Sequence, residues 1–197
     1  DEFNKFIATV ENIDNKETYD TLFLTGLRIG ELCALRWCDL DLEHKKLSVR
    51  GSFSTASRKV TSPKTKTSIR TIDLPNRLVE ELKQRYERKK KLDGFNDLYY
   101  VFGDIAVTWP GTFRYRFNND LKNVDVKHIT IHGFRHSHAS YLLSNPMISE
   151  SLVAERLGHS IDMLRSTYAH IYEKRRTALV EYIESQNDFI TENSNMF

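Results

Sequence analysis

The segment HGFRHSHAS, residues 132–140, places one arginine and three histidines at the start of a helix predicted over residues 132–143. His132 and Arg135 lie three residues apart, so they share one face of the first turn. Free backbone N–H groups and the positive end of the helix dipole favour an anion there. An imidazole beside a forked guanidinium therefore predicts a site for a phosphate group. The structural alternative is a capping histidine beside a solvated arginine.

The same segment also offers a metal interpretation, because His132 and His136 have the i, i+4 spacing of two metal ligands. The zinc-protease pattern needs a glutamate directly after the first histidine, and Gly133 holds that position. No third ligand has convincing spacing. We therefore predict no metal and no other cofactor.

Three further pieces carry candidate chemistry. Arg28 follows Thr25-Gly26-Leu27, and Glu31 lies three residues on, where its carboxylate can hold the guanidinium or form an ordinary surface pair. Lys64, in the turn-prone stretch 62–67, is either a solvated lysine or a proton donor on a long stem.

The last piece is LGHS, residues 157–160, which is followed by a tyrosine. His159 lies in a tight turn before a helix for which Ser160 is the predicted N-cap, and Tyr168 comes nine residues after His159. A straight helix of that length rises about 13–14 Å. Both side chains can therefore meet one small group only if the chain bends between them.

Periodicity predicts an α+β fold that is mostly α-helical, with a small three-stranded antiparallel sheet. Residues 1–184 form the predicted domain, and residues 185–197 a polar, mobile tail. The predicted strands cover residues 47–51, 58–61 and 68–74. The predicted helices cover residues 2–10, 17–25, 27–37, 76–91, 110–121, 132–143, 149–157, 162–170 and 173–184.

The net charge of +2, from 29 basic and 27 acidic side chains, hides an uneven distribution. Residues 51–170 hold 19 basic and 12 acidic side chains, whereas both ends of the chain are acidic. The near-neutral total is therefore no argument against DNA as a partner. No apolar run approaches the roughly 20 residues of a membrane span, and Cys33 and Cys38 are predicted to be reduced, as in the cytoplasm.

In this order, the stretches TGLRIGEL (25–32), PKT (63–65), HGFRHSHAS (132–140), LGHS (157–160) and YAH (168–170) resemble the catalytic domain of the tyrosine recombinases, the family of lambda-type phage integrases. Each motif alone is weak, whereas the ordered set is specific. The resemblance covers nearly the whole chain. It implies a site-specific DNA recombinase that cleaves and rejoins strands through a 3′-phosphotyrosine, without metal or ATP.

The resemblance also implies a role for each motif residue. Arg28 and Arg135 would hold the non-bridging oxygens of one DNA phosphate, and Glu31 would support Arg28. Tyr168 would be the nucleophile. The remaining roles are proton transfers and a phosphate contact: Lys64 would protonate the leaving 5′ oxygen, His132 would assist near the nucleophile, and His159 would donate to the phosphate. Lys66 is the alternative to Lys64.

Contacts to the DNA backbone are expected from exposed cations of the basic middle segment. The candidates are Arg58, Lys59, Lys66, Arg70, Arg114 and Arg116.

The resemblance implies double-stranded attachment sites as the substrate and self-association into a tetramer on DNA. It also implies an N-terminal core-binding domain that this stretch lacks. The source would be a phage or conjugative transposon, acting in the cytoplasm of a bacterial host. Two alternatives remain at this point: a type IB topoisomerase-like or telomere-resolving enzyme, and a DNA-binding regulator without catalysis. The second has no need of Tyr168.

Overall fold

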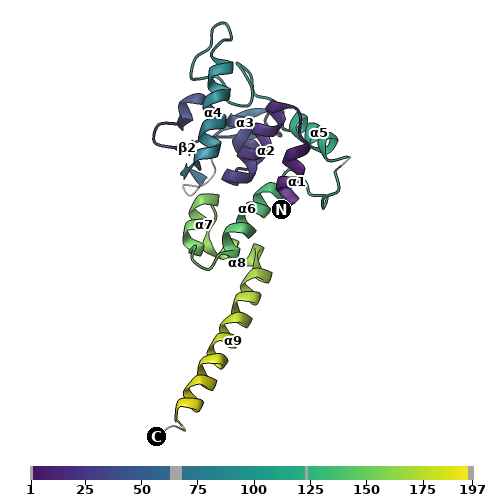
Figure 1. Cartoon of the computed structure of the whole chain (residues 1–197). Coiled ribbons are helices and arrows are strands. Elements are labelled where there is room, and N and C mark those ends of the chain that lie inside the picture. Colours follow the sequence, from purple (N-terminus) through teal and green to yellow (C-terminus); the bar gives the residue numbers. More distant parts are fainter. Residues whose placement is uncertain (1, 63–67, 123, 195–197) are drawn as a thin grey trace.

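The computed structural model describes residues 2–62, 68–122 and 124–194, with the side chains of the last helix described as far as residue 186. The chain forms a helical body from which the last helix projects (Figure 1). The described α-helices are α1 (Glu2–Thr9), α2 (Ile13–Thr25), α3 (Ile29–Ala34), α4 (Asn76–Lys89), α5 (Pro110–Leu121), α6 (Gly133–Ser144), α7 (Glu150–Leu157), α8 (Ile161–Thr167) and α9 (Ala169–Ser194).

The main core is built around α2, which lies in the middle of the body in contact with α1, α4, α5 and α6 (Figure 1). Tyr19 of α2 packs among three phenylalanines, with ring centroids 4.9–6.4 Å apart within the group: Phe6, Phe117 and Phe134. Full burial of such a side chain stabilises the fold by roughly 1.5–3 kcal/mol. Phe134 lies in the first turn of α6, so this core fixes the position of the next residue, Arg135.

A second, smaller core joins α6, α7 and α8 below the first. Ala139 and Leu143 are four residues apart in α6, so they face the same side of the helix. They pack against the inner faces of α7 and α8. The other buried members are Val153, Ala154, Leu157, Leu164 and Tyr168.

The sheet differs in part from the prediction. β2 (Lys46–Val49) lies between β1 (Leu40–Asp41) and β5 (Arg70–Asp73) in a three-stranded antiparallel sheet. The strand predicted over residues 58–61 is not part of this sheet. It is β4 (Lys59–Thr61), which pairs with β3 (Ser52–Ser54) in a separate hairpin.

Packing on α3 explains this separate hairpin. A Cβ atom on Gly30 would lie 2.7 Å from Ser52 Oγ, so β3 is held directly against α3 and away from the sheet. The serines around Ser52 predict a turn rather than a strand. Packing against α3, which lies some twenty residues earlier, is not visible in such a local signal.

Both ends of α5 and the C-terminal ends of α2 and α7 agree with the prediction, whereas several other helix ends differ. The helix predicted over residues 27–37 is confined to α3, because Arg28 is extended (φ −71°, ψ 148°) and Trp37 lies in a short 3-10 helix, η1 (Trp37–Asp39). α4, predicted over residues 76–91, runs from Asn76 to Lys89 with Pro75 as its N-cap. Ser160 is the N-cap of α8, as predicted, and its side chain accepts from the backbone of Met163.

The last helix is longer than predicted. α9 begins at Ala169 and runs to Ser194, so most of the predicted tail continues the helix. α9 leaves the body and carries its C-terminal end far from the main core (Figure 1). Within the described part of the chain, no helix combines the length and apolar character needed to cross a membrane.

Candidate active site

Gly26 shapes the junction between α2 and α3, where the first motif begins. Its backbone is left-handed (φ 68°), and an added Cβ atom would lie 2.7 Å from the His138 ring and 2.9 Å from Leu157. Real Cβ atoms essentially never approach so closely, so only glycine fits. The chain then turns so that Arg28 stands at the N-terminus of α3.

Glu31 fixes Arg28 in the way the spacing predicts. Its Oε1 accepts from Arg28 Nη1 at 3.0 Å, and its Oε2 accepts from the Arg28 backbone N–H at 2.9 Å. Burial alone would raise the pKa of Glu31, but the hydrogen bonds and charge of Arg70 and the contacts from Arg28 outweigh it and lower that pKa. Glu31 is therefore an anion that orients the half-exposed Arg28.

Arg70 completes this group, and its predicted role in DNA contact is wrong. The residue is 7% exposed, and its Nη1 and Nη2 donate to the two Glu31 carboxylate oxygens at 3.0 and 2.9 Å. Its Nε donates to the Arg156 carbonyl at 2.7 Å. The buried Arg70 side chain therefore links β5 to α3 and α7 by hydrogen bonds. A strand alternates inward and outward positions, and residue 70 lies on the inward set.

Arg135 is held by backbone carbonyls from two distant turns. Its Nη1 donates to Gly26 O and its Nη2 to Leu157 O, each at 2.6 Å. Burial, with the charge of Arg28, lowers the pKa of Arg135 to about 9. The guanidinium therefore stays protonated at pH 7, as a fixed cation below the surface.

His159 meets Arg135 because α7 ends in a left-handed glycine, Gly158 (φ 64°). Its Nε2 lies 2.8 Å from Arg135 Nη2. A guanidinium can only donate, so Nε2 accepts, and the proton of the neutral ring lies on Nδ1. Burial, then the charges of Arg135 and Arg28, lower the pKa of His159 to about 4, so the ring is neutral at pH 7. Nδ1 is a buried donor with no partner in the described part of the chain.

Tyr168 lies where the chain bends between α8 and α9. It ends α8 with φ −115° and ψ 30°, and it is 3% exposed within the second core. Burial raises the pKa of Tyr168, and the nearby charge of Arg135 opposes that rise.

The histidine nearest the Tyr168 hydroxyl is His136, which the sequence pattern suggested only as a metal ligand. His136 Nδ1 lies 3.1 Å from Tyr168 Oη. His132, the predicted neighbour of the nucleophile, is the N-cap of α6 and packs edge-on against His136, with ring centroids 4.9 Å apart. The helical spacing of residues 136, 139 and 143 could have indicated this position, because it places His136 on the same face of α6 as the buried Ala139 and Leu143.

Lys64 and Lys66 lie outside the described residues. Within the described part of the chain, no group of three or more His, Cys, Asp or Glu side chains is placed to hold a metal ion.

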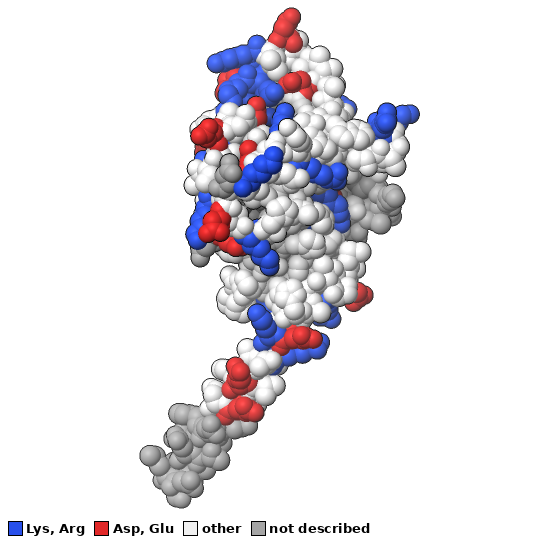
Figure 2. All heavy atoms as spheres, turned by 90° about the vertical axis from the view of Figure 1, so that its right-hand side faces the viewer, with Lys and Arg blue, Asp and Glu red and all other residues white. Residues whose placement is uncertain are grey.

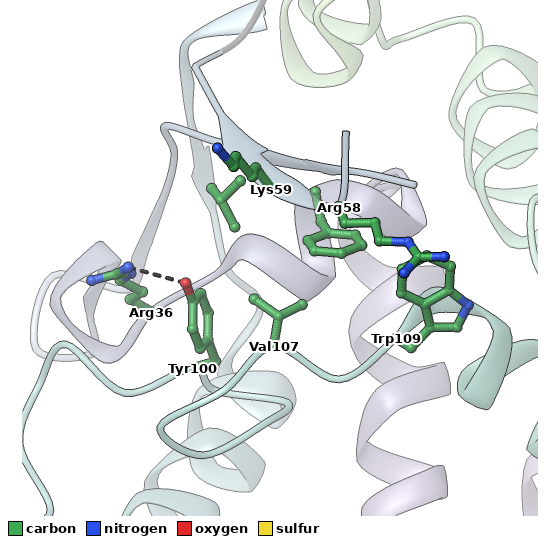
Figure 3. Close-up of a pocket in the computed structure, with 8 residues that line it drawn as sticks. Arg36, Arg58, Lys59, Tyr100, Val107 and Trp109 are labelled. Carbon is green, nitrogen blue, oxygen red and sulfur yellow. Dashed lines mark hydrogen bonds between the residues drawn. The ribbon is translucent and has the colours of Figure 1, made fainter. Parts of the chain in front are cut away.

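The β3–β4 hairpin presents two of the predicted DNA contacts. Arg58 and Lys59 are exposed and line an open pocket of about 900 Å³ with Arg36, Tyr100 and Trp109 (Figure 3). Arg36 donates to Tyr100 Oη at 3.0 Å and lies over that ring. No acidic side chain lines the pocket in the described residues.

Arg114 and Arg116 are exposed on α5. Figure 2 shows Lys and Arg side chains spread over the body among acidic ones, whereas the lower described part of α9 carries acidic ones. The exposed cations of the body are thus placed to meet a polyanion, and this acidic described stretch of α9 is not.

The sequence as a whole matches the phage integrase family over residues 1–175. The chain belongs to the phage integrase family. The ICEBs1 integrase of Bacillus subtilis (strain 168) is 30% identical over an alignment of 197 positions. The alignment covers 93% of this chain and 53% of that protein. The integrase of Staphylococcus phage L54a is 29% identical, and the match covers 82% of this chain and 49% of that protein. This integrase-family chain therefore spans about half the length of these relatives.

Solved structures agree on the fold of this integrase-family chain. XerA recombinase superposes with a TM-score of 0.68 at 22% identity, covering 89% of this chain and 63% of that one. The Tn1549 transposon integrase (residues 82–397), solved with circular intermediate DNA, superposes with a TM-score of 0.68 at 22% identity. The match covers 91% of this chain and 64% of that one. The fold is that of a tyrosine recombinase catalytic domain, mostly helical with a small three-stranded antiparallel sheet.

Proposed function

We propose that this chain is the catalytic domain of a site-specific DNA recombinase, with Tyr168 as its nucleophile. The observation that carries the proposal is the contact between Arg135 and His159, 2.8 Å apart, beside the buried Tyr168. A fixed cation and a buried, unpartnered N–H donor next to a phenol match what attack on a phosphodiester needs.

The chemistry follows from these groups. Tyr168 Oη bonds to phosphorus and the bond to the 5′ oxygen breaks, which leaves a 3′-phosphotyrosine and a free 5′-hydroxyl. Arg28, Arg135 and His159 stabilise the charge on the non-bridging oxygens, so we propose that no metal is needed. The 5′ oxygen takes its proton from a general acid, the role that the resemblance gives to Lys64. A 5′-hydroxyl from another strand then reverses the step, without ATP.

Contacts to the double-stranded attachment site come from exposed cations outside this cluster. Arg58 and Lys59 on the hairpin and Arg114 and Arg116 on α5 are exposed. Such side chains bind phosphates without reading sequence. Contacts that read the base sequence would come in part from the longer protein, whose core-binding domain would close around the DNA from the N-terminal side.

Assembly into a tetramer on DNA would use α9. Leu179, Val180 and Ile183 are 58%, 53% and 49% exposed on this projecting helix. Such apolar exposure marks an interaction surface rather than a solvated helix. We propose a neighbouring subunit as the partner of α9, in a bacterial cytoplasm. The encoding element would be a phage or conjugative transposon, as the names of the ICEBs1 and Staphylococcus phage L54a relatives support.

A nicked suicide duplex that carries the joined ends of the encoding element tests the proposal. The wild-type chain, fused to its own upstream domain, should form a covalent protein–DNA adduct, and Tyr168→Phe should form none. Tyr172→Phe is the matched control and should react normally. Exchange of strands between two attachment sites, rather than relaxation of supercoils alone, separates a recombinase from a topoisomerase. An adduct that survives Tyr168→Phe overturns the proposal.

A further inference from the structure

His136 is the hydrogen-bond partner of the Tyr168 hydroxyl. In the described part of the chain, no other side chain or backbone group bonds to Tyr168 Oη, and the Nδ1–Oη distance is 3.1 Å. The two ring centroids are 5.9 Å apart at an interplanar angle of 58°. The contact is therefore made through the ring nitrogen and not by stacking.

The packing of α6 keeps this contact in place. Ala139 and Leu143, on the same face of α6 as His136, are fully buried in the core that also holds the Tyr168 ring. His132 closes the other side of His136, with its ring edge-on at 89°. These neighbours restrict both rings before any DNA arrives, which lowers the entropic cost of positioning the nucleophile.

The other histidines of the site are engaged elsewhere. His159 Nε2 accepts from Arg135, which orients the ring toward the guanidinium, and the low pKa of His159 keeps that ring neutral. His132 contacts the His136 ring rather than the tyrosine, and burial, with the charges of His136 and Arg135, lowers its pKa. Neither ring is placed to receive the phenol proton.

We propose that His136 is the general base of the cleavage step, a role that rests on the proposed function. As Tyr168 Oη bonds to phosphorus and the bond to the 5′ oxygen breaks, the phenol proton moves to His136 Nδ1. His136 is exposed, so water can take the second ring proton and restore the neutral imidazole. In rejoining, a protonated His136 returns a proton to the departing tyrosine oxygen. A separate acid protonates the 5′ oxygen.

The environment of the phenol makes such a base necessary. Burial raises the pKa of Tyr168 above its ordinary value of 10, so the phenolate is scarce at neutral pH. The titratable groups in direct contact with His136 are His132 and Tyr168, and Arg135 supplies the charge that favours the phenolate. A positioned base of this kind accelerates proton transfer by about 10²–10⁴-fold.

Substitutions at residue 136 test the proposal in the same suicide-substrate assay, under single turnover. His136→Ala removes the acceptor, and His136→Asn keeps an amide oxygen near the Nδ1 position that cannot carry the proton. Both should slow adduct formation by about 10²–10⁴-fold and remove the acid limb of the wild-type pH–rate profile. His128→Asn, a substitution of another exposed histidine, should change neither. A His136→Asn variant with the wild-type rate and pH profile overturns the base role.

A second readout does not depend on cleavage. In protein labelled with 13C at tyrosine Cζ, the Tyr168 resonance of the wild type should move as the pH is lowered from 8 to 5. The same resonance should stay flat in His136→Asn, while the other tyrosines are unaffected. A Tyr168 signal that ignores residue 136 overturns the contact itself. If the wild type forms no adduct at Tyr168, the proposed function fails, whereas a normal wild-type adduct with normal His136→Ala activity refutes this inference alone.

Discussion

Glu31 is the residue on which the geometry of the first arginine depends. Its two carboxylate oxygens accept four hydrogen bonds, two from Arg28 and two from the buried guanidinium of Arg70. The side chains of Arg70 and Glu31 are only 3% and 5% exposed. An unpaired charge in such surroundings is strongly unfavourable, so each member of the group is needed by the others.

Glu31→Gln should therefore destabilise the fold, by up to about 3–5 kcal/mol, because it leaves Arg70 without its counter-charge. The pKa of Glu31 is lower in the folded state than in the unfolded state. The pair thus stabilises fully above the unfolded value, and that contribution is lost as pH falls through the folded value. Urea denaturation at several pH values should show a gap between wild type and variant that narrows in acid.

Glu80→Gln is the control for this experiment, because Glu80 forms an exposed pair with Lys83. Such pairs contribute about 0–1 kcal/mol. Equal effects of the two substitutions, or a gap that stays constant into strong acid, would contradict the role given to Glu31.

Contacts between residues that are close along the chain can be predicted from the sequence. The Arg28–Glu31 pair follows from a spacing of three. The prediction for Arg70 is wrong because its partner Glu31 is remote in sequence. The sequence also does not show which face of the strand is buried, so a buried arginine there cannot be told from an exposed one. The role of His136 escapes the sequence because its contact, Tyr168, lies at a different helix junction.

Among the elements, the α2–α3 junction determines the geometry of the candidate active site, because Gly26 lies directly against α6 and α7. Gly26→Ala should destabilise the fold well beyond the roughly 1–2 kcal/mol of a left-handed alanine. The added Cβ would lie 2.7 Å from His138. Gly94→Ala is the matched control, since Gly94 has φ 69° but its Cβ would lie 3.4 Å from one hydroxyl. Thermal melting of both variants measures the difference, and equal losses would show that Gly26 supplies backbone freedom only.

The β3–β4 hairpin permits a matched test of DNA contact. Arg58 and Lys45 are the two left-handed non-glycine residues of the described chain, with φ 53° and 56°. Glycine relieves strain at both positions, so neither substitution should harm the fold. Arg58→Gly should weaken binding to duplex DNA and reduce its salt dependence by about one phosphate contact, whereas Lys45→Gly should not. Fluorescence anisotropy at several salt concentrations measures both, and identical slopes would remove Arg58 from the DNA surface.

The sequence predicts helix ends well where a local cap decides them, as at Gly26, Ser160 and Gly158. It predicts strand partners poorly. Residues 59–61 have β-type sequence, but whether they join the sheet or a separate hairpin depends on the close approach of Ser52 to Gly30, which only the folded chain reveals.

For the whole molecule, two cores separate the residues proposed to bind the phosphate from the proposed nucleophile. The main core fixes Arg28 and the start of α6, whereas the second core holds Tyr168. α9 follows directly after Tyr168, so we expect a partner bound to α9 to affect the position of the proposed nucleophile. The charge distribution predicts an acidic C-terminal end suited to a protein neighbour but not the length of this helix.

Charges on the apolar face of α9 should therefore block assembly. Leu179→Glu combined with Ile183→Glu should reduce the sedimentation coefficient of the protein–DNA complex, because both side chains are about half exposed and available to a neighbour. Glu184→Gln, on the same helix, should leave assembly intact. Unchanged sedimentation of the double variant would contradict a subunit contact through this face.

The most direct test of the account is to locate the DNA on the protein. After reaction with the suicide duplex, trypsin releases the peptide 166–174, which contains both Tyr168 and Tyr172. Fragmentation in the mass spectrometer should assign the nucleotide mass to Tyr168, through a 3′-phosphate. A nucleotide on Tyr172, on any other residue, or linked through a 5′-phosphate would contradict the proposed mechanism.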